Sequence, residues 1–390
     1  MRTMAFFDII KKDEKSRARL GVINTAHGPV KTPAFLPIGT RGSVKAVTSE
    51  ELKFWGADMI LANTYHLWLR PGDTLISRAG GLHKFMGWDG PIFTDSGGYQ
   101  VYSLGEKIKG GPANRRGDSG PILKKIDEAG VEFQNELDGA THVLSPEESI
   151  QIQSNLGSDI ALVLDDVPAL PATEKRLKSS LDLTLRWAQR AKAHYEKIVG
   201  DSVNPGQRLY GIVQGGDLEE LRKKSAQGLQ KIGFDGYGIG GLAVGEDAKT
   251  LYKVLGFIIP HLEEDKPRHL LGVGYPEQIL KAISLGLDTF DCVLPTRNAR
   301  HGQLFINKKS SKFGDYDLIT ITNAKFKEDF TPADNSCSCY GCLHHNRAYL
   351  RHLFMSGEPL GIRLATMHNL RFYLDLMDRV RRAIEFDSFS

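Results

Sequence analysis

The sequence has no long hydrophobic run and no apolar leader. Nowhere do roughly 18 apolar residues follow one another, as a membrane-spanning helix requires. The first residues, MRTMAFFDIIKKDEKSR, become charged too early to form the apolar core of a secretory signal. These absences argue against integral membrane and secreted proteins, so we expect a cytoplasmic protein with no membrane partner.

An excess of charge of one sign is also missing. The 50 Lys and Arg residues nearly balance the 47 Asp and Glu residues, which leaves a formal net charge of +3. This mildly basic balance permits a nucleic-acid partner without indicating one. With 41% hydrophobic and 25% charged residues, the composition is that of an ordinary globular protein, and 390 residues suffice for one large domain plus an appendage.

Cysteine is rare, but it is clustered. Three of the four cysteines fall within the segment SCSCYGC at 336–342: Cys337, Cys339 and Cys342. Thiols stay reduced in the cytoplasm, so the C-x-C-x-x-C spacing indicates a Zn(II) site rather than disulfides. The histidines that could supply a fourth ligand are His344, His345, His352 and the more distant His368. Cys292 lies far upstream in an apolar run, where we expect it to pack.

Eight short apolar runs, bounded by Gly, Pro or Asp, alternate with amphipathic segments. The strand-like runs are 33–38, 58–64, 91–98, 159–166, 208–216, 236–242, 268–274 and 289–295. The helix-like segments are 48–56, 145–157, 173–198, 218–233, 247–262 and 276–287. This alternation predicts an α/β fold, a closed (β/α)8 TIM barrel. A doubly wound open sheet is the alternative, but no G-x-G-x-x-G motif follows the first strand.

Polar residues occur where the predicted strands end. They are Asp95, Asp165, Asp166, Gln214 and Asp291, with Gly240, Gly241 and Gly274 on neighbouring strands. Asp and Gly often only terminate strands and cap the next helix. In a barrel, however, these ends meet at one mouth, where active sites lie. Two opposed carboxylates there could perform a double displacement at an anomeric carbon.

Several long motifs in this order resemble bacterial tRNA-guanine transglycosylases. They are FTDSGGYQVYSL, YGIVQGG, GIGGLAVGE, LLGVG, DTFDCVLPTRNARHG and CSCYGC, with a histidine 26 residues beyond the last cysteine. The similarity extends from about Phe6 to Arg382. The resemblance implies a (β/α)8 barrel with a C-terminal zinc-binding subdomain. It also implies exchange of guanine at wobble position 34 of G-U-N anticodon tRNAs for a 7-deazaguanine.

The resemblance assigns roles to the catalytic and metal-binding residues. Asp291 would be the nucleophile on ribose C1′, and Asp95 the general acid/base. Asp95 could instead orient the ribose. The family pattern makes His368 the fourth metal ligand, beside Cys337, Cys339 and Cys342. Four protein ligands leave no open position, so one structural Zn(II) per chain is expected.

Base recognition is expected from the strand ends. A carboxylate can accept from the N1-H and N2-H2 donors of guanine or preQ1, and an amide can donate to O6. Tyr99 could stack on the base, although core packing is an equal alternative. The substrate-binding residues expected here are Asp95, Ser96, Gly97, Gly98, Tyr99, Asp165, Gln214, Gly240 and Gly241, with the backbone as far as Leu242.

The anticodon loop of the tRNA is expected to contact two segments. The first, GVGYPEQ, comprises Gly272, Val273, Gly274, Tyr275, Pro276, Glu277 and Gln278. The second comprises Thr296, Arg297, Asn298, Ala299 and Arg300, whose guanidiniums can reach phosphates or base edges. Further phosphate contacts are possible from Lys124, Lys125, Lys308, Lys309, Arg347 and Arg351, although each is individually an ordinary surface residue. Tyr349 and His352 share a helical face where bacterial relatives dimerise, so we expect a homodimer.

The chain departs from the family pattern at two places, and the first affects the expected substrate. Val167, in DDVP, replaces the cysteine of the usual bacterial D-E-C-T, as in queuine-using eukaryotic members. Val244 keeps the bacterial residue, and its bulk should exclude the cyclopentenediol of queuine. We therefore favour 7-aminomethyl-7-deazaguanine (preQ1), with queuine salvage as the alternative. The segment Lys107 to Lys125 is longer than usual and reads as an RNA-facing lid or as tolerated length.

The expected organisation is a barrel in 1–300 with an insertion around 102–145. A zinc-binding subdomain, 301–370, is inserted near the last strand, and 371–390 forms the final barrel helix and C-terminus. A zinc-dependent TIM-barrel hydrolase is a less favoured alternative, because the first strand has no metal-binding histidine. A non-catalytic RNA-binding zinc protein would leave the converging carboxylates unexplained.

Overall fold

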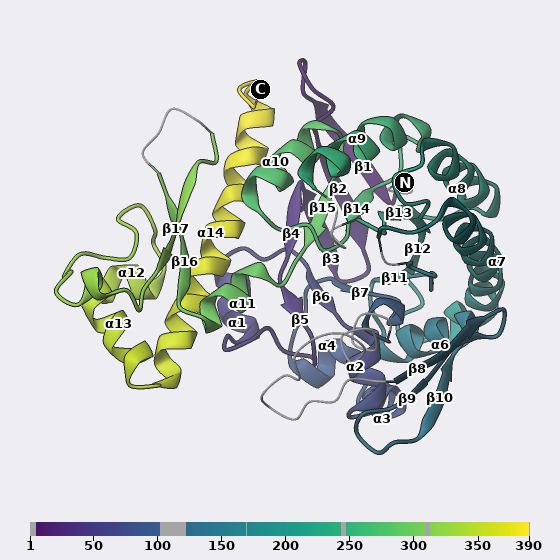
Figure 1. Ribbon diagram of the computed structural model, residues 1–390, viewed down its shortest axis with the longest axis horizontal. Helices are drawn as coiled ribbons and strands as arrows, with labels where there is room; N and C mark the ends of the chain where they lie inside the picture. The colour runs from purple at the N-terminus through teal and green to yellow at the C-terminus, as the bar shows by residue number, and fades with distance from the viewer. Residues whose placement is uncertain (1–4, 102–121, 169, 243–246, 309–312, 390) are drawn as a thin grey trace.

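A computed structural model describes residues 5–101, 122–168, 170–242, 247–308 and 313–389 (Figure 1). Val244, Lys309 and residues 107–121 of the Lys107 to Lys125 segment lie outside the described residues. Within the described residues, no helix is both long and apolar enough to cross a bilayer.

The central sheet closes on itself. Its strand order is β4-β15-β14-β13-β12-β11-β7-β6-β5, and every neighbouring pair is parallel. β4 (Ala34–Leu36) and β5 (Ile38–Gly39) are two halves of the first predicted strand, separated by Pro37. β4 pairs with the last strand and β5 with the next strand along the chain, so the sheet is an eight-stranded barrel. The predicted (β/α)8 barrel is confirmed.

The other seven predicted strands all occur in the barrel. They are β6 (Ile60–Ala62), β7 (Ile92–Thr94), β11 (Ile160–Leu162), β12 (Arg208–Val213), β13 (Gly236–Ile239), β14 (Arg268–Leu270) and β15 (Thr289–Asp291). Every residue of these strands is buried except Arg208, which begins β12. Both faces of the sheet are covered, because side chains fill the barrel interior and helices cover the outside. The strands are shorter than the apolar runs, since each run continues into the loop at the barrel mouth.

The predicted helices also form, with polar caps at several starts. They are α1 (Ser49–Phe54), α6 (Pro146–Leu156), α7 (Glu174–Ile198), α8 (Glu219–Ile232), α9 (Ala248–Ile258) and α10 (Pro276–Ser284). Thr48, Ser145, Thr173 and Asp247 each accept a backbone N–H in the first turn of a helix, which stabilises that end. Three short helices that follow β6 were not predicted: α2 (Thr64–Leu69), α3 (Asp73–Arg78) and α4 (Gly81–Met86).

An N-terminal antiparallel sheet, also not predicted, covers one end of the barrel. It consists of β1 (Phe7–Lys12), β2 (Arg19–Thr25) and β3 (Gly28–Thr32). Arg19 forms a buried two-point ion pair with Asp288, at 2.8 and 2.6 Å. His27, in the β2–β3 turn, bonds to Asp159. Asp288 and Asp159 directly precede β15 and β11, so this sheet lies at the amino ends of the strands, opposite the mouth.

A second small sheet follows β7, within the predicted insertion. Its strands are β8 (Ile122–Asp127), β9 (Gly130–Gln134) and β10 (Thr141–Leu144), in antiparallel order. Figure 1 shows this sheet beside α6, away from the C-terminal segment.

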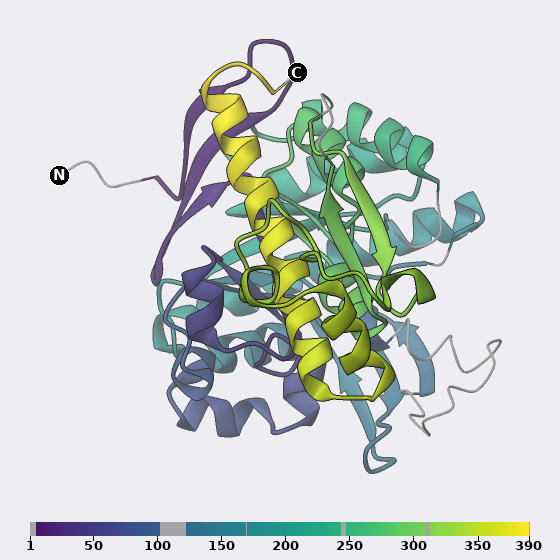
Figure 2. The same cartoon turned by 90° about the vertical axis from the view of Figure 1, so that its left-hand side faces the viewer.

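The C-terminal segment leaves the barrel after β15 and returns through one long helix. It contains α11 (Leu294–Arg300), β16 (Gln303–Asn307), β17 (Tyr316–Thr320), a 3-10 turn at Ala324–Phe326, α12 (Tyr340–His344), α13 (Arg347–Met355) and α14 (Pro359–Glu385). Two other 3-10 turns, Val199–Asp201 and Ile259–His261, follow α7 and α9. Figure 2 shows α14 running from this segment to the N-terminal sheet. The helix continues across the predicted boundary at 370/371 without a break.

Candidate active site and metal centre

One cavity of about 430 Å³ opens at the carboxyl ends of the barrel strands. Each of the eight strands or the residues just after it contributes to the wall: Ile38, Leu61, Asp95, Leu162, Ile212, Gly240, Leu271 and Asp291. The volume is typical of a small-molecule site. The predicted residues that line it are Asp95, Ser96, Tyr99, Asp165, Gly240, Gly241, Gly272, Asp291 and Arg297.

Asp95 directly follows β7 and is held by three donors. The side-chain nitrogens of Asn63 and Gln100 both donate to its Oδ2, the latter at 2.6 Å, and the backbone N–H of Thr64 donates to Oδ1 at 2.9 Å. Burial raises the pKa of Asp95 to about 6, although these hydrogen bonds oppose the rise and the charge of Asp291 adds to it. A carboxyl group with this pKa can both give and take a proton near neutral pH.

Asp291 ends β15 and projects into the cavity. Its Oδ1 lies 3.1 Å from His269 Nε2 and accepts the Gly272 backbone N–H at 3.2 Å. Among the described residues, no donor contacts Oδ2. One carboxylate oxygen is therefore held by the protein, and the other is available to a substrate.

Asp165 is the third carboxylate of the cavity. Burial raises its pKa to about 7, and the nearby charges of Asp166 and Asp95 add to the rise. The Gln214 amide nitrogen opposes it by donating to Asp165 Oδ2 at 2.5 Å. The adjacent Asp166 does not line the cavity. Arg176 forms a two-point ion pair with it at 2.5 and 2.7 Å.

Gln214 lies behind the cavity wall rather than on it. A Cβ at Gly240 would come within 2.6 Å of the Gln214 Nε2, and one at Gly241 within 2.4 Å of its Oε1. Gly241 also has a φ of +65°, which a side chain would strain. These two glycines therefore permit the close approach that places Gln214 against Asp165.

Gly97 and Gly98 form the turn after Asp95 and Ser96 and lie outside the cavity lining. Gly97 has a φ of +83°, and a Cβ on Gly98 would lie 2.6 Å from the Leu164 side chain. Their contribution is the shape of the turn.

Tyr99, the next residue, is 45% exposed at the cavity edge, so core packing does not explain its position. Val167 is buried and lines the cavity.

The two predicted RNA-binding segments are only partly accessible. In α11, Arg297 and Arg300 are exposed, whereas Thr296, Asn298 and Ala299 are buried. In the other segment, Gly272, Tyr275 and Glu277 are exposed, Gln278 is half-buried, and Val273, Gly274 and Pro276 are buried. The buried members support the loops: the Gly274 carbonyl, for example, accepts a hydrogen bond from Tyr373.

Sequence reasoning missed two cations near α11. Burial and then the charges of Arg41 and Arg300 lower the pKa of Lys45, and burial and Arg297 lower that of Arg300. Arg41, Lys45, Arg297 and Arg300 therefore form a basic group, and none has a carboxylate partner among the described residues. By contrast, Lys125, Lys308 and Arg347 are paired with Asp127, Asp317 and Asp329. Lys124 donates to Thr141 and Arg351 to backbone carbonyls.

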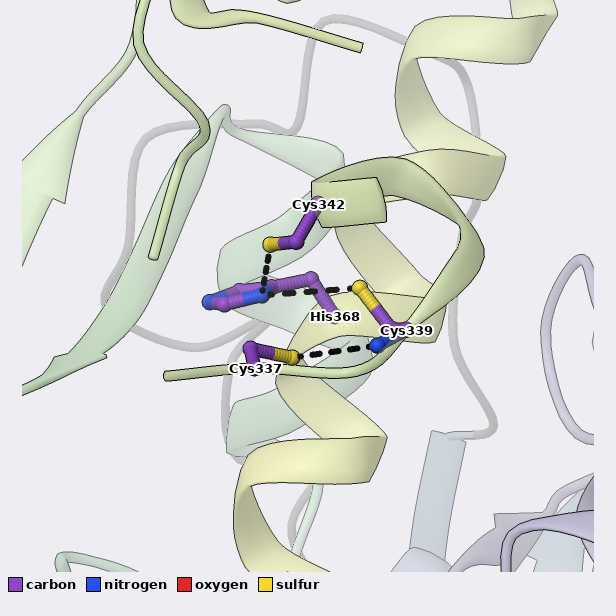
Figure 3. Close-up of side chains that lie close together, drawn as sticks. All are labelled: Cys337, Cys339, Cys342 and His368. Carbon is purple, nitrogen blue, oxygen red and sulfur yellow. Dashed lines mark hydrogen bonds between the residues drawn. The ribbon is translucent and has the colours of Figure 1, made fainter. Parts of the chain in front are cut away.

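The predicted metal ligands come together around one point (Figure 3). The sulfur atoms of Cys337, Cys339 and Cys342 and a ring nitrogen of His368 all lie within 4.8 Å of one another. His368 Nδ1 is 3.3 Å from the Cys342 Sγ and 3.8 Å from the Cys339 Sγ. Its Nε2 lies 2.7 Å from the Phe305 carbonyl, which directs Nδ1 toward the sulfurs. These four residues can hold a metal ion.

The nearer histidines are not part of this cluster. His344, His345 and His352 instead form a row of aromatic contacts with Tyr340 and Tyr349. The row lies on the exposed side of α12 and α13, where Tyr340 is 53% and Tyr349 37% exposed. Cys292, by contrast, is buried next to Asp291, and burial raises its thiol pKa.

A second group of possible ligands lies at the opposite end of the barrel. His27 Nδ1 is 2.8 Å from Asp159 Oδ1, and His83 Nε2 is 3.2 Å from Asp159 Oδ2. The two imidazoles stack with centroids 3.6 Å apart and planes 16° apart. Their nitrogens thus face different oxygens, while the backbone N–H groups of His27 and Ile92 also donate to the carboxylate. This arrangement is a hydrogen-bonded network that joins the β2–β3 turn and α4 to the barrel.

The residues that hold the Asp95 and Asp291 carboxylates were also missed. Asn63 lies in the strand-like run 58–64, Gln100 inside FTDSGGYQVYSL and His269 directly before LLGVG, but nothing in their spacing indicates a contact. A histidine inside the apolar run RHLLGVG is the one visible signal, because an imidazole buried in a barrel strand needs a partner.

Comparison with known proteins agrees with this geometry. The family described as queuine tRNA-ribosyltransferase matches residues 13–390. A queuine tRNA-ribosyltransferase of Thermoanaerobacter pseudethanolicus is 46% identical over 381 residues, which cover 98% of this chain and 94% of that protein. The enzyme of Vibrio campbellii is 46% identical over 383 residues, 98% and 93% of the two chains. That of Vibrio atlanticus is 47% identical over 378 residues, 97% and 92%. The chain belongs to the queuine tRNA-ribosyltransferase family.

Proposed function

We propose that this protein exchanges guanine 34 of G-U-N anticodon tRNAs for preQ1 by double displacement. Family membership supports a pentosyltransferase that acts on tRNA. The observation that supports the mechanism is the meeting of Asp95, Asp165 and Asp291 in one cavity. Each carboxylate has different surroundings, so the three can perform different tasks.

In the first displacement, Asp291 attacks ribose C1′. Oδ1 is held by His269 and Gly272, while no donor in the described part of the chain contacts Oδ2, so Oδ2 is the attacking oxygen. The C1′–O bond forms as the C1′–N bond to guanine breaks. Asp95 in its protonated form gives a proton to the departing base, which leaves as neutral guanine.

In the second displacement, preQ1 replaces guanine in the cavity. Asp95, now ionised, takes the proton from the attacking ring nitrogen of preQ1. That nitrogen attacks C1′, the C1′–O bond breaks, and the Asp291 carboxylate is regenerated. A pKa of about 6 suits Asp95 for both proton transfers. Each step balances without an added cofactor.

Asp165 is proposed to recognise the base. Its carboxylate can accept from the N1-H and N2-H2 donors that guanine and preQ1 share, while the Gln214 amide, which donates to it, fixes its orientation. Adenine and pyrimidines lack this donor pair, and an unpaired buried carboxylate would disfavour them by about 1 to 3 kcal/mol. Ser96, Gly97 and Gly98 shape the adjoining turn, and Tyr99 lies where it can stack on the base.

The basic group at the mouth is proposed to bind the anticodon loop. These guanidiniums and this ammonium, which have no acidic partner in the described part of the chain, suit phosphate contacts. Guanine 34 must leave the loop stack to reach Asp291, and Arg297, which lines the cavity, can contact its neighbours. Gly272, Tyr275 and Glu277 are the accessible residues of the second RNA-binding segment.

The metal is proposed to be a single structural Zn(II). Three sulfurs and one imidazole nitrogen are a donor set that zinc prefers, and they leave no open position. The zinc would join the turn at 337–342 to α14 and would not contact the reacting atoms. Because α14 continues past 370, we propose that the zinc-binding segment shares this helix with the barrel.

We also propose a homodimer through the exposed aromatic row on α12 and α13. Tyr340, Tyr349 and His352 are exposed and make T-shaped or tilted ring contacts along this row, and aromatic residues are enriched at interfaces. Light scattering should give a mass of two chains, and the double variant Tyr340→Ala/Tyr349→Ala should shift it to one.

The central experiment measures base exchange and covalent RNA attachment. Wild-type protein should replace labelled guanine 34 by preQ1, and a base analogue that leaves but cannot return should trap a protein–RNA adduct on a denaturing gel. Asp291→Asn should give neither product, whereas Asp291→Asn with substantial exchange would contradict its role as nucleophile. Queuine incorporation at the same rate as preQ1 would favour the queuine-salvage alternative, which Val167 supports because queuine-using members have valine at this position.

A further inference from the structure

His269 is a fully buried imidazole directly beneath the nucleophile. It lies in β14, in parallel register with Thr289 of the neighbouring β15. Side chains two residues apart on a strand project to the same face. Thr289 and Asp291 therefore both project to the barrel interior, and His269 lies between them. On its remaining side, the ring stacks on Phe93 of β7, with centroids 4.6 Å apart.

The two ring nitrogens have separate partners. Nε2 is 3.1 Å from Asp291 Oδ1, and Nδ1 is 2.9 Å from Thr289 Oγ1. An ionised carboxylate can only accept, so the hydrogen must be on Nε2. In the neutral ring, Nδ1 then accepts the Thr289 hydroxyl hydrogen. Thr289 thus fixes the tautomer that lets His269 donate to Asp291.

We propose that His269 is the positioning residue for the nucleophile and assists its departure from C1′. This inference rests on the proposed function, in which Asp291 forms the glycosyl ester. By donating to Oδ1, His269 directs Oδ2 toward the cavity. In the ester, Oδ1 is the carbonyl oxygen. When preQ1 displaces the ester, negative charge returns to the carboxylate, and the donor on Oδ1 stabilises that charge.

The two displacements therefore depend on His269 to different extents. In the first, Asp291 loses charge, so the hydrogen bond weakens and its benefit is mainly orientation. In the second, charge develops on the leaving carboxylate and the hydrogen bond strengthens. Loss of the donor should slow the second displacement more than the first, and the covalent adduct should accumulate.

The test compares three variants in the full-length protein. His269→Phe keeps a ring beside Phe93 but removes the donor, His269→Gln restores an N–H donor, and Thr289→Val removes the group that fixes the tautomer. We expect His269→Phe to lower kcat about 100-fold and to lower KM for tRNA as well, because a larger fraction of chains is held in the adduct at steady state. His269→Gln should recover at least tenfold of the loss, and Thr289→Val should be intermediate.

The possible results separate this inference from the proposed function. Wild-type kcat in His269→Phe, or a Gln variant as slow as the Phe variant, would overturn it even if Asp291→Asn is inactive. If Asp291→Asn remains active, the proposed function itself fails. Should His269→Phe not fold, the adduct fraction in Thr289→Val decides: an unchanged fraction contradicts the positioning role, and an increased fraction supports it.

Discussion

At the scale of single residues, the site separates three carboxylates by their surroundings. Asp95 has three donors and Asp165 one, yet burial raises the pKa of both, to about 6 and about 7. A buried carboxylate that stays partly protonated destabilises the fold once it ionises. The protein therefore loses some stability in order to keep these groups ready for substrate.

We expect Asp165→Asn to stabilise the protein in a pH-dependent way. Between pH 3.8 and about 7 the folded state holds the Asp165 proton while the unfolded state releases it, so wild-type stability falls as pH rises through this window. Asparagine keeps the acceptor for Gln214 but never ionises. The variant should be more stable at pH 8 by up to about 4 kcal/mol, at about 1.4 kcal/mol for each unit of the shift, and the gain should shrink toward pH 4.

Urea unfolding at a series of pH values measures this difference. Asp217→Asn is a suitable control, because Asp217 is an exposed carboxylate and should show no such trend. Asp165→Asn should also lose the preference for guanine over adenine in the base-exchange reaction. If the stability difference between wild type and Asp165→Asn is the same from pH 4 to pH 8, the raised pKa of Asp165 is contradicted.

At the scale of elements, α14 joins the metal site to the barrel mouth. His368 contacts the sulfurs and the Phe305 carbonyl. The next residue, Asn369, accepts the Phe305 backbone N–H at 3.1 Å and donates to the carbonyls of Pro295, in α11, and Gln303, at 3.0 and 2.9 Å. Two adjacent residues of one helix thus fix β16 and α11, and α11 contains Arg297.

Asn369→Leu is therefore expected to destabilise the protein and to weaken tRNA binding. Leucine has a similar size but leaves one buried N–H and two carbonyls without this partner, at about 1 to 3 kcal/mol for each group that stays unpaired. Thermal unfolding should show a lower Tm, and KM for tRNA should rise because α11 shifts. Arg382→Ala, on an exposed position of the same helix, should change neither value.

At the scale of the whole molecule, both terminal regions of the chain pack against the barrel, and the mouth stays open. The N-terminal sheet covers the amino ends of the strands through Arg19 with Asp288 and His27 with Asp159. The C-terminal segment departs after β15 and returns along α14, which reaches the N-terminal sheet (Figure 2). The cluster of three cysteines and His368 lies within this excursion and outside the cavity, so a metal ion bound there would stabilise the segment without contacting the cavity.

Removal of the metal should therefore lower the stability of the fold and should affect the rate of base exchange only indirectly. Cys339→Ser and His368→Ala should each lose the roughly one zinc per chain expected of wild type, and both should have a lower Tm. Cys292→Ser is the matched control, since this fourth cysteine is distant in sequence and outside the cluster, and it should keep its zinc. Elemental analysis gives the metal content. Full zinc retention in His368→Ala would assign the fourth ligand to another residue.

Much of the fold could be predicted because its signals are local. Apolar runs and capping residues such as Ser145 and Thr173 indicated the strands and helices of the barrel, and closure followed from their number. The N-terminal sheet was not predicted, because its strands are short and half-exposed and contain charged residues, as in FDIIKK and RLGVINT. The short helices after β6 also escaped, since six residues give too little periodicity to detect.

The sequence by itself determined the motifs and the cysteine spacing, and with them the family and the candidate residues Asp95, Asp291 and Cys337 to Cys342. Only the tertiary structure decided what those residues contact. Asn63 and Asp95 follow two different strands, His269 and Asp291 lie on two others, and His368 is 26 residues beyond Cys342. Such contacts depend on strand register and barrel closure, which bring distant segments together. Burial and hydrogen bonding then tune each carboxylate, and neither can be read from a residue's neighbours in the chain.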